Sequence, residues 1–238
     1  MQHAYLIEGH WIARCPPSVY YIPDFITKEE EEYLTNNVYA APKPKWTQLS
    51  NRRLQNWGGL PHPKGMVCEE LPQWLQKYAK TIAELGTFED KIPNHVLVNE
   101  YKAGQGIMPH EDGNLFYPTV STISLGSHTL LDFYYHLQDH SSQENEHIQS
   151  LTSFEDRYFM SLLLQPRSLV LVQSDMYKLH LHGIAERTED HITESVSNLD
   201  FCPGVNLGDV LKRGTRISLT IRYVPKVLKV KLMLGKKR

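Results

Sequence analysis

The sequence has few cysteines, no long apolar run and no excess of charge of one sign, and each shortage excludes a class of protein. Cys15, Cys68 and Cys202 are too few and too widely spaced for a disulfide framework or a paired-cysteine zinc site, so we expect reduced thiols. No stretch approaches the roughly 20 apolar residues of a spanning helix, and the first residues lack a secretory pattern, so we expect no membrane association. The 25 basic residues are balanced by 27 acidic ones, which excludes a uniformly basic coat for nucleic acid.

What the sequence does contain is typical of one globular domain covering residues 1–238, with 41% hydrophobic residues. Thr27 and Glu30 form a capping box that predicts a helix to about Asn37, and the apolar spacing over Leu71–Leu85 predicts a second helix. Short runs rich in β-branched and aromatic residues then predict six strands, at 95–102, 118–126, 130–136, 158–164, 168–173 and 215–224. This order indicates a mainly β or α+β domain, for which a double-sheet jelly roll leaves an open end for a site.

The predicted strands lie in a core of about 94–224, and the segments around them have distinct compositions. Residues of about 1–90 hold the predicted helices and, at 40–66, a basic and aromatic segment that reads as a long substrate-lid loop or an irregular strand pair. Polar insertions at 138–156 and 186–214 interrupt the core, and loops of that length are usually functional or mobile. The tail at 225–238 is basic, which suits a solvated end or a polyanion contact.

The residues that indicate chemistry begin with His110 and Asp112, whose spacing puts both side chains on one face of an extended segment. Such a pair is common by chance, so it needs a further ligand. His182, after a strand-like run, could supply a second imidazole, and two imidazoles with one carboxylate suit iron(II) with three positions left for a cosubstrate and dioxygen. His180 competes for the same role, and an ordinary surface or core histidine is the alternative for each.

A second feature is the run from Arg216 to Arg222, in which polar residues alternate with Ile217, Leu219 and Ile221. If the apolar face packs on the core, the arginines point into the barrel, which is costly unless an anion such as a carboxylate binds there. A half-exposed strand with its polar face in water is the alternative. Asn99 and Tyr101 share one face of an earlier predicted strand and could also bind a carboxylate.

Together these motifs resemble the AlkB-like family of iron(II)- and 2-oxoglutarate-dependent dioxygenases over roughly residues 94–223. The matching motifs are Asn99-x-Tyr101, His110-x-Asp112, Ser121-Thr-Ile-Ser-Leu-Gly126, His182-Gly-Ile184 and Arg216-x-Ser-x-Thr-x-Arg222. The resemblance implies a double-stranded β-helix, a jelly roll, with N-terminal helices packed on one sheet. It also implies Fe(II), 2-oxoglutarate and O2 as the cofactor and cosubstrates.

The resemblance further implies a role for each matching residue. His110, Asp112 and His182 would bind iron, and Arg216 would bind the distal carboxylate of 2-oxoglutarate. The remaining positions would contact the cosubstrate or line its pocket, and these are Asn99, Tyr101, Ser218, Thr220 and Arg222, the last beside the metal. Asn114 stands where the bacterial nucleobase-repair member has an acid that helps recognise its base, so the motif by itself does not identify the substrate.

The basic and aromatic segment suggests what the substrate is. Trp46, Trp57, Arg52 and Arg53 would suit base stacking and phosphate contacts with a flipped or single-stranded nucleotide, and Tyr117 could line the same opening. We therefore expect a monomeric N-alkyl nucleobase demethylase acting on DNA or RNA, in the cytoplasm and nucleus. A protein side-chain hydroxylase or demethylase, and a nucleic-acid-binding module with a vestigial iron site, are the alternatives.

Overall fold

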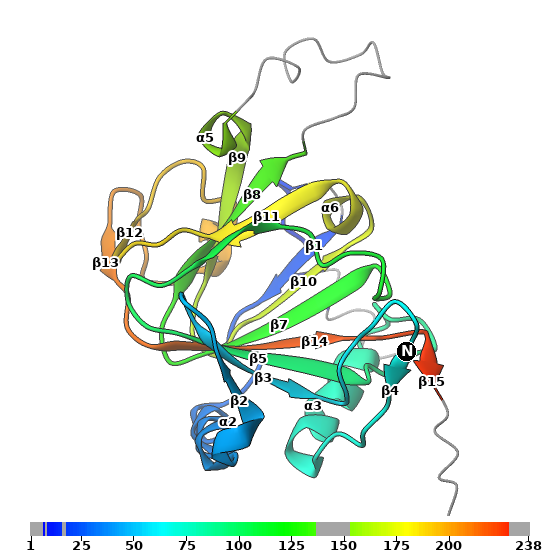
Figure 1. The fold of residues 1–238 in the computed structure, drawn as a ribbon. Helices are drawn as coiled ribbons and strands as arrows, with labels where there is room; N and C mark the ends of the chain where they lie inside the picture. The colour runs from blue at the N-terminus through cyan, green and yellow to red at the C-terminus, as the bar shows by residue number, and fades with distance from the viewer. Residues whose placement is uncertain (1–6, 8, 16–17, 137–152, 229–238) are drawn as a thin grey trace, which may run out of the picture.

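The computed structural model describes residues 7, 9–15, 18–136 and 153–228, which form two facing β-sheets (Figure 1). The strands of the larger sheet are β1 (Val19–Ile22), β2 (Trp46–Gln48), β3 (Arg53–Trp57), β5 (His95–Tyr101), β7 (Thr119–Leu125), β10 (Leu169–Gln173) and β14 (Arg216–Arg222). The strands of the smaller sheet are β6 (Ile107–His110), β8 (Thr129–Tyr135), β9 (Tyr158–Leu164) and β11 (His180–Ile184). The spatial orders are β1-β10-β7-β14-β5-β3-β2 and β6-β11-β8-β9. The mainly β fold confirms the expected fold class.

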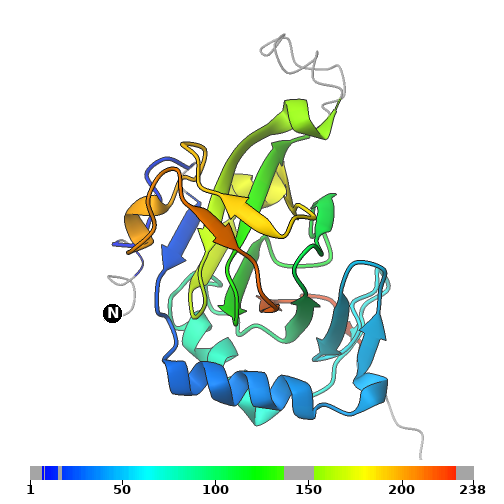
Figure 2. The same cartoon turned by 90° about the vertical axis from the view of Figure 1, so that its left-hand side faces the viewer.

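Two helices cover the outer face of the larger sheet. Helix α2 (Lys28–Ala40) runs beneath the sheet in Figure 2, and α3 (Gln73–Ala83) lies beside it in Figure 1. Both hydrogen bonds of the capping box between Thr27 and Glu30 are present, so the helix starts where the sequence predicts. Apolar residues of both helices, such as Leu34 and Leu75, form one buried cluster with outward-facing residues of the sheet.

The inner face of the larger sheet is polar along two neighbouring strands. Arg216 lies opposite Tyr101, and Ser218 lies opposite Asn99 in the antiparallel register of β14 and β5. Directly opposite residues share a face, so all four side chains point between the sheets. Arg216 and Ser218 are each only 3% exposed, so this strand is not the half-exposed one that its pattern also allowed.

The basic segment at 40–66 forms a strand pair rather than a loop. A short 3-10 turn (Lys43–Lys45) leads into β2, which pairs antiparallel with β3, and β3 pairs with β5. The hairpin therefore continues the larger sheet beyond β5. The next short strand, β4 (Met66–Val67), pairs in parallel with β15 (Val227–Leu228).

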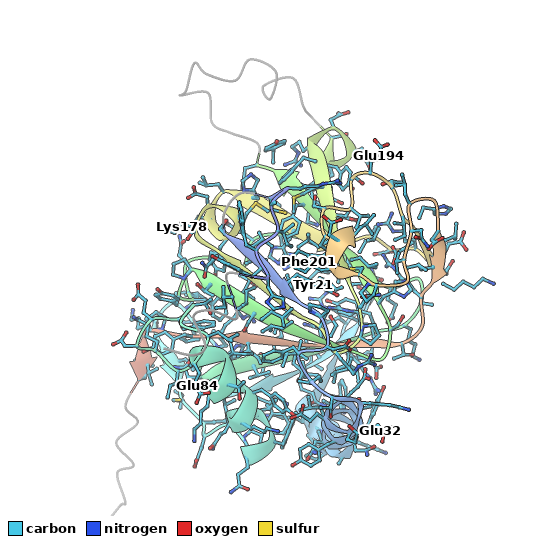
Figure 3. The ribbon with its side chains drawn as sticks, turned by 180° about the vertical axis from the view of Figure 1, so that it is seen from behind. Tyr21, Glu32, Glu84, Lys178, Glu194 and Phe201 are labelled. Atoms are coloured by element: carbon cyan, nitrogen blue, oxygen red, sulfur yellow. The ribbon has the colours of Figure 1, made fainter. Side chains whose placement is uncertain are left out.

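The insertion at 186–214 is ordered and packs on the barrel. It contains β12 (Glu189–His191), a 3-10 turn (Leu199–Phe201) and β13 (Val210–Lys212). Phe201 meets Tyr21 of β1 edge-on, with ring centroids 6.4 Å apart, and both residues are labelled near each other in Figure 3. Ile192 and Val196 join the second buried cluster with residues of β8, β9 and β10, so the insertion completes the core instead of forming a mobile loop.

Other parts of the chain bear on the earlier expectations. Most of the insertion at 138–156 lies outside the described residues, and its end forms α5 (Phe154–Arg157). Of the tail, residues beyond 228 also lie outside them. The remaining helix, α6 (Ser174–Lys178), connects β10 to β11. Among the described residues, no helix has the length and apolarity needed to cross a bilayer.

Candidate metal centre and cosubstrate pocket

Two strands of the smaller sheet bring the three candidate metal ligands together. His110 at the end of β6 lies directly opposite His182 in β11, and Asp112 follows two residues after His110. One donor atom from each residue lies within 4.8 Å of the other two, and this is the one such group in the part of the chain that the structure describes. The β pairing therefore brings together His110 and His182, two ligands that are 72 residues apart in the sequence.

Both imidazoles are set in the form that binds a metal. His110 Nδ1 lies 2.9 Å from the carbonyl oxygen of Met108, so Nδ1–H donates to it and Nε2 is left as the ligand atom. Burial lowers the pKa of His182 to about 4, so its ring is neutral near pH 7. The two ring centroids are 4.5 Å apart.

Arg222 holds the carboxylate of Asp112 in its ionised form. Burial alone would raise the pKa of Asp112, but Arg222 and the two imidazoles outweigh burial and lower it. Arg222 Nη1 donates to Asp112 Oδ1 at 2.5 Å, and Arg222 Cζ lies 3.9 Å from the ring centroid of Phe116. Asp112 Oδ2 is buried without a hydrogen-bond partner, which leaves that oxygen for a metal ion.

His180, the competing ligand, has other surroundings. Its Nδ1 lies 3.3 Å from the carbonyl oxygen of Asp175, and its ring lies 5.7 Å and 5.1 Å from those of Tyr135 and Phe159. Burial lowers the pKa of His180. It belongs to an aromatic cluster and does not join the group of three ligand atoms.

A cavity of about 320 Å³ joins the metal ligands to the polar inner face of the larger sheet. Arg216 lies within it, fully buried, and donates from Nη2 to Ser124 Oγ at 3.0 Å while Nε has no partner. Burial lowers the pKa of Arg216 to about 10, so the guanidinium is charged at neutral pH. The other lining residues include every expected cosubstrate residue, namely Asn99, Tyr101, Ser218, Thr220 and Arg222.

These donors fit the groups that the motifs imply. Two imidazoles and one carboxylate are an iron(II) ligand set, and the Asp112 oxygen without a partner marks its place. A buried guanidinium without a carboxylate partner is costly, and a carboxylate of 2-oxoglutarate would pair with Arg216.

Comparison with known proteins decides the family, because the 2OG-Fe(II) oxygenase superfamily profile matches residues 24–222. The chain belongs to this superfamily. It is 56% identical over 231 residues to the Danio rerio "Probable RNA/DNA demethylase ALKBH6", covering 97% of this chain and 96% of that one. Members of the 2OG-Fe(II) oxygenase superfamily use Fe(II) and 2-oxoglutarate, so the predicted cofactor and cosubstrate are confirmed.

More distant relatives of this 2OG-Fe(II) oxygenase are also AlkB-like. The chain is 26% identical over 237 residues to a Macaca fascicularis tRNA (carboxymethyluridine(34)-5-O)-methyltransferase ALKBH8, covering 88% of this chain and 31% of the other. The solved structure of OsALKBH1 superposes with a TM-score of 0.55 at 13% identity, covering 87% of this chain and 99% of that one. The latter likeness confirms the jelly-roll fold.

The five residues expected to contact substrate do not lie on one surface of the oxygenase. Arg52 alone of them lines the cavity. Trp46, Arg53 and Trp57 occupy alternate positions whose pairing with Gln55, Glu100 and Val96 puts them on the outer face of the hairpin. Tyr117 packs against the core near Phe88, with ring centroids 6.1 Å apart.

Sequence reasoning missed the apolar wall of the cavity in this oxygenase. Leu131 of β8 and Leu164 of β9 line it from the facing smaller sheet, and Val170 and Val172 line it from β10 of the larger sheet. The signal for them is the same alternation that places Asn99 and Tyr101 on one face, but it must be combined with strand pairing across both sheets. Tyr177, whose hydroxyl donates to the carbonyl oxygen of Gly113 at 2.9 Å, had no sequence signal.

Proposed function

We propose that this oxygenase oxidatively removes N-alkyl groups from nucleobases of DNA or RNA, presented as a single strand or a flipped base. The observation that carries the proposal is the convergence of the metal ligands and Arg216 in one cavity. The name of the 56% identical zebrafish relative supports the nucleobase as substrate. Three arginines line the cavity, and among the described residues Arg222 alone of them is paired with a carboxylate, which also favours anionic ligands.

Bound iron(II) and 2-oxoglutarate supply the activation of dioxygen, with the cosubstrate converted to succinate and carbon dioxide while a substrate C–H bond is hydroxylated. The protein orients the ligands for this chemistry. Arg222 fixes Asp112, and the carbonyl oxygen of Met108 fixes the His110 ring. The apolar wall that includes Leu131 and Val172 excludes water from the reacting side of the cavity.

Demethylation needs no further catalytic residue in this scheme. Hydroxylation of an N-methyl group gives N–CH2OH, whose C–N bond then breaks to release formaldehyde while the hydroxyl proton passes to the ring nitrogen. The protein therefore has to place the methyl carbon at the metal and to recognise the base.

The test supplies purified protein with Fe(II), ascorbate and 2-oxoglutarate, together with single-stranded DNA and RNA that carry a single N-methylated base. Mass spectrometry of the bases and a formaldehyde assay measure the reaction. We expect loss of the methyl group from at least one substrate and equal amounts of formaldehyde and succinate. His182→Ala is the inactive control.

A second arm offers the same enzyme pools of methylated and unmethylated peptides. Succinate formation stimulated by a peptide and by no oligonucleotide would replace the nucleobase with a protein side chain. If neither the oligonucleotides nor the peptides increased the turnover of 2-oxoglutarate above its rate without substrate, the proposed substrate class would be contradicted. The oxygenase chemistry itself would still stand.

A further inference from the structure

Arg52 and Arg53 are neighbours in sequence but lie on opposite faces of the β2–β3 hairpin. Arg53 donates to Glu100 from Nε and Nη2, at 2.7 Å and 2.8 Å, on the outer face. Arg52 Nε donates inward to Asn99 Oδ1 at 3.1 Å, and Arg52 lines the central cavity. One arginine is therefore committed to a carboxylate of the protein, and the other faces the cavity.

The charge of Arg52 is not balanced by the protein. Neither Arg52 nor Arg216 has an ion pair with a carboxylate among the described residues, whereas Arg222 is paired with Asp112. Both guanidiniums act on the same phenol, because each opposes the rise in the pKa of Tyr101 that burial causes. The cavity therefore contains two cations without a carboxylate partner in the described part of the chain, Arg52 on Asn99 and Arg216 with Cζ 5.9 Å from the ring centroid of Tyr101, and a dianion would be stabilised by them.

The hydrogen bond from Arg52 also fixes the orientation of Asn99. Its Oδ1 accepts from Arg52, and its Nδ2 donates to no other described residue. Held in this way, the amide presents its N–H donors rather than its oxygen for a ligand in the cavity. A carboxylate or keto oxygen is the complementary acceptor.

The turn that carries Arg52 is tied to the opposite side of the barrel. Leu49 N donates to the carbonyl oxygen of Arg52 at 2.9 Å, which closes the turn. Asn51 Nδ2 donates to Glu186 Oε1, and Glu186 follows the strand that holds His182. The turn at 49–52 therefore bridges from Asn99 on the larger sheet to the segment after β11.

We infer that Arg52 is a cosubstrate-binding residue, which pairs with a carboxylate of 2-oxoglutarate, orients Asn99 and so couples the hairpin turn to cosubstrate binding. Arg52 is then not a contact for nucleic-acid phosphate. The inference rests on the use of 2-oxoglutarate by the superfamily and is independent of the nucleobase substrate. It predicts that the hairpin becomes more rigid when the cosubstrate binds.

The test compares Arg52→Gln with Arg53→Gln in the full chain loaded with Mn(II), which replaces iron without turnover. Calorimetric titration with 2-oxoglutarate should show binding weakened about 10- to 100-fold by Arg52→Gln, as for loss of a charge-assisted hydrogen bond in a buried site. Arg53→Gln should stay within about 2-fold of the unmodified protein, and Mn(II) affinity should be unchanged in both. Arg52→Lys, which keeps the charge but loses the planar fork, should give an intermediate affinity.

Amide hydrogen exchange measures the rigidity of the hairpin turn separately from the overall stability of the fold. In the unmodified protein, 2-oxoglutarate should slow exchange across 49–54, and in Arg52→Gln this protection should be lost even at saturating cosubstrate. Unchanged cosubstrate affinity in both Arg52 variants would overturn the inference. A selective loss of single-stranded oligonucleotide affinity in its place would assign Arg52 to phosphate. Should Arg52→Gln fail to fold, an unchanged affinity of Arg52→Lys for 2-oxoglutarate would by itself overturn the inference.

Discussion

His180 and His182 stand two positions apart in one strand, and their different partners show how neighbours decide the role of a side chain. His182 faces His110 across the β6–β11 pairing, where a carboxylate also lies. His180 lies opposite Tyr135, among aromatic rings. Alternation puts both histidines on one face of β11 and so makes both candidates in the sequence. The pairing of β11 with β6 then brings only His182 beside His110 and Asp112.

Substitution of these two histidines should therefore have different effects on metal binding. His182→Ala removes one of three ligands and should weaken Mn(II) or Fe(II) binding by more than about 100-fold, beyond the typical cost of losing a group that only orients a ligand. His180→Ala should leave the affinity within a few-fold. Titration calorimetry under anaerobic conditions measures both, and an equal loss in the two variants would show that a different set of atoms binds the metal.

The residues of the site were predictable from sequence to the extent that they lie in local motifs. Arg216 and Arg222 have fixed spacing within one strand, and Asp112 follows two residues after His110 at the end of β6, so local spacing alone relates the members of each pair. The choice of His182 over His180 depended on resemblance, because both positions share a face. The pairing of Arg222 with Asp112 joins residues 110 positions apart, and spacing gives no information about it.

At the scale of an element, the β2–β3 hairpin shows what composition leaves undetermined, namely which face of a strand each side chain occupies. Its composition, rich in tryptophan and basic residues, suggested a surface for nucleic acid. Its register with β5 turns Trp46, Arg53 and Trp57 outward, against α2 and α3. Register comes from pairing with a distant strand, and a shift of one residue would exchange the two faces.

Trp57 should accordingly contribute to stability rather than to nucleic-acid binding. Its ring meets Trp74 of α3 edge-on at 5.6 Å, and its Nε1 donates to Gln55 Oε1 at 2.9 Å. Trp57→Ala should lower the free energy of unfolding by about 2–3 kcal/mol because packing and a hydrogen bond are lost. Urea denaturation measures this change, and Leu60→Ala, at a 70% exposed position, is the control.

Without urea, and at a temperature where it is fully folded, the Trp57→Ala protein should bind single-stranded oligonucleotides with an affinity within about 2-fold of that of the unmodified protein. A large loss of this affinity with unchanged stability would show that Trp57 stacks on bases. Fluorescence anisotropy with a labelled oligonucleotide distinguishes the two outcomes.

The insertion at 186–214 is fastened by a buried group of charges that its polar composition did not reveal. Arg213 donates to both oxygens of Asp190, at 2.8 Å and 2.7 Å, and Arg187 lies 3.0 Å from Asp190 and 3.1 Å from Asp132. Asp132 belongs to β8, so the charges connect the insertion to the smaller sheet. Long polar segments are usually mobile, and this one is held because its charges are paired.

Loss of the Asp190 charge should destabilise the protein in a pH-dependent manner. Burial opposes ionisation of Asp190, but His128, whose Nε2 lies 3.4 Å from Oδ2, and the hydrogen bonds from Arg213 outweigh it and hold the pKa of Asp190 well below its usual range. Asp190→Asn leaves buried Arg213 unpaired and should cost about 3–5 kcal/mol of unfolding free energy at pH 7. Asp200→Asn, at an exposed position of the same insertion, should change it by less than about 0.5 kcal/mol.

The sign of the pH effect follows from the lowered pKa of Asp190. Its contribution is complete above the unfolded-state value of about 4 and is lost as the pH falls toward the lower folded-state pKa. The stability gap between the unmodified protein and Asp190→Asn should therefore be constant from pH 5 to 8 and should narrow below about pH 4. A gap that narrowed between pH 8 and 6 would mean that a different group controls it.

At the scale of the whole molecule, the site lies between two sheets that contribute different parts of it. The smaller sheet positions His110 and His182, and the larger sheet carries Arg216 and Arg222. The ion pair between Arg222 and Asp112 is the direct polar contact of the two parts at the metal centre. Ligands bound in the cavity would therefore connect the sheets as well as react.

Loading of the site should consequently raise thermal stability in two separable steps. A ligand at 100 times its dissociation constant stabilises the folded state by about 2.7 kcal/mol, or roughly 5–10 °C in melting temperature for a chain of this size. Mn(II) alone should give one increment, and 2-oxoglutarate with Mn(II) a further one. In Arg216→Ala the metal increment should persist while the cosubstrate increment disappears at concentrations that saturate the unmodified protein, because the buried carboxylate would lose its guanidinium partner. In His182→Ala both increments should disappear. Differential scanning fluorimetry across a 2-oxoglutarate titration measures these shifts, and a full cosubstrate increment in Arg216→Ala would show that another cation of the cavity binds the carboxylate.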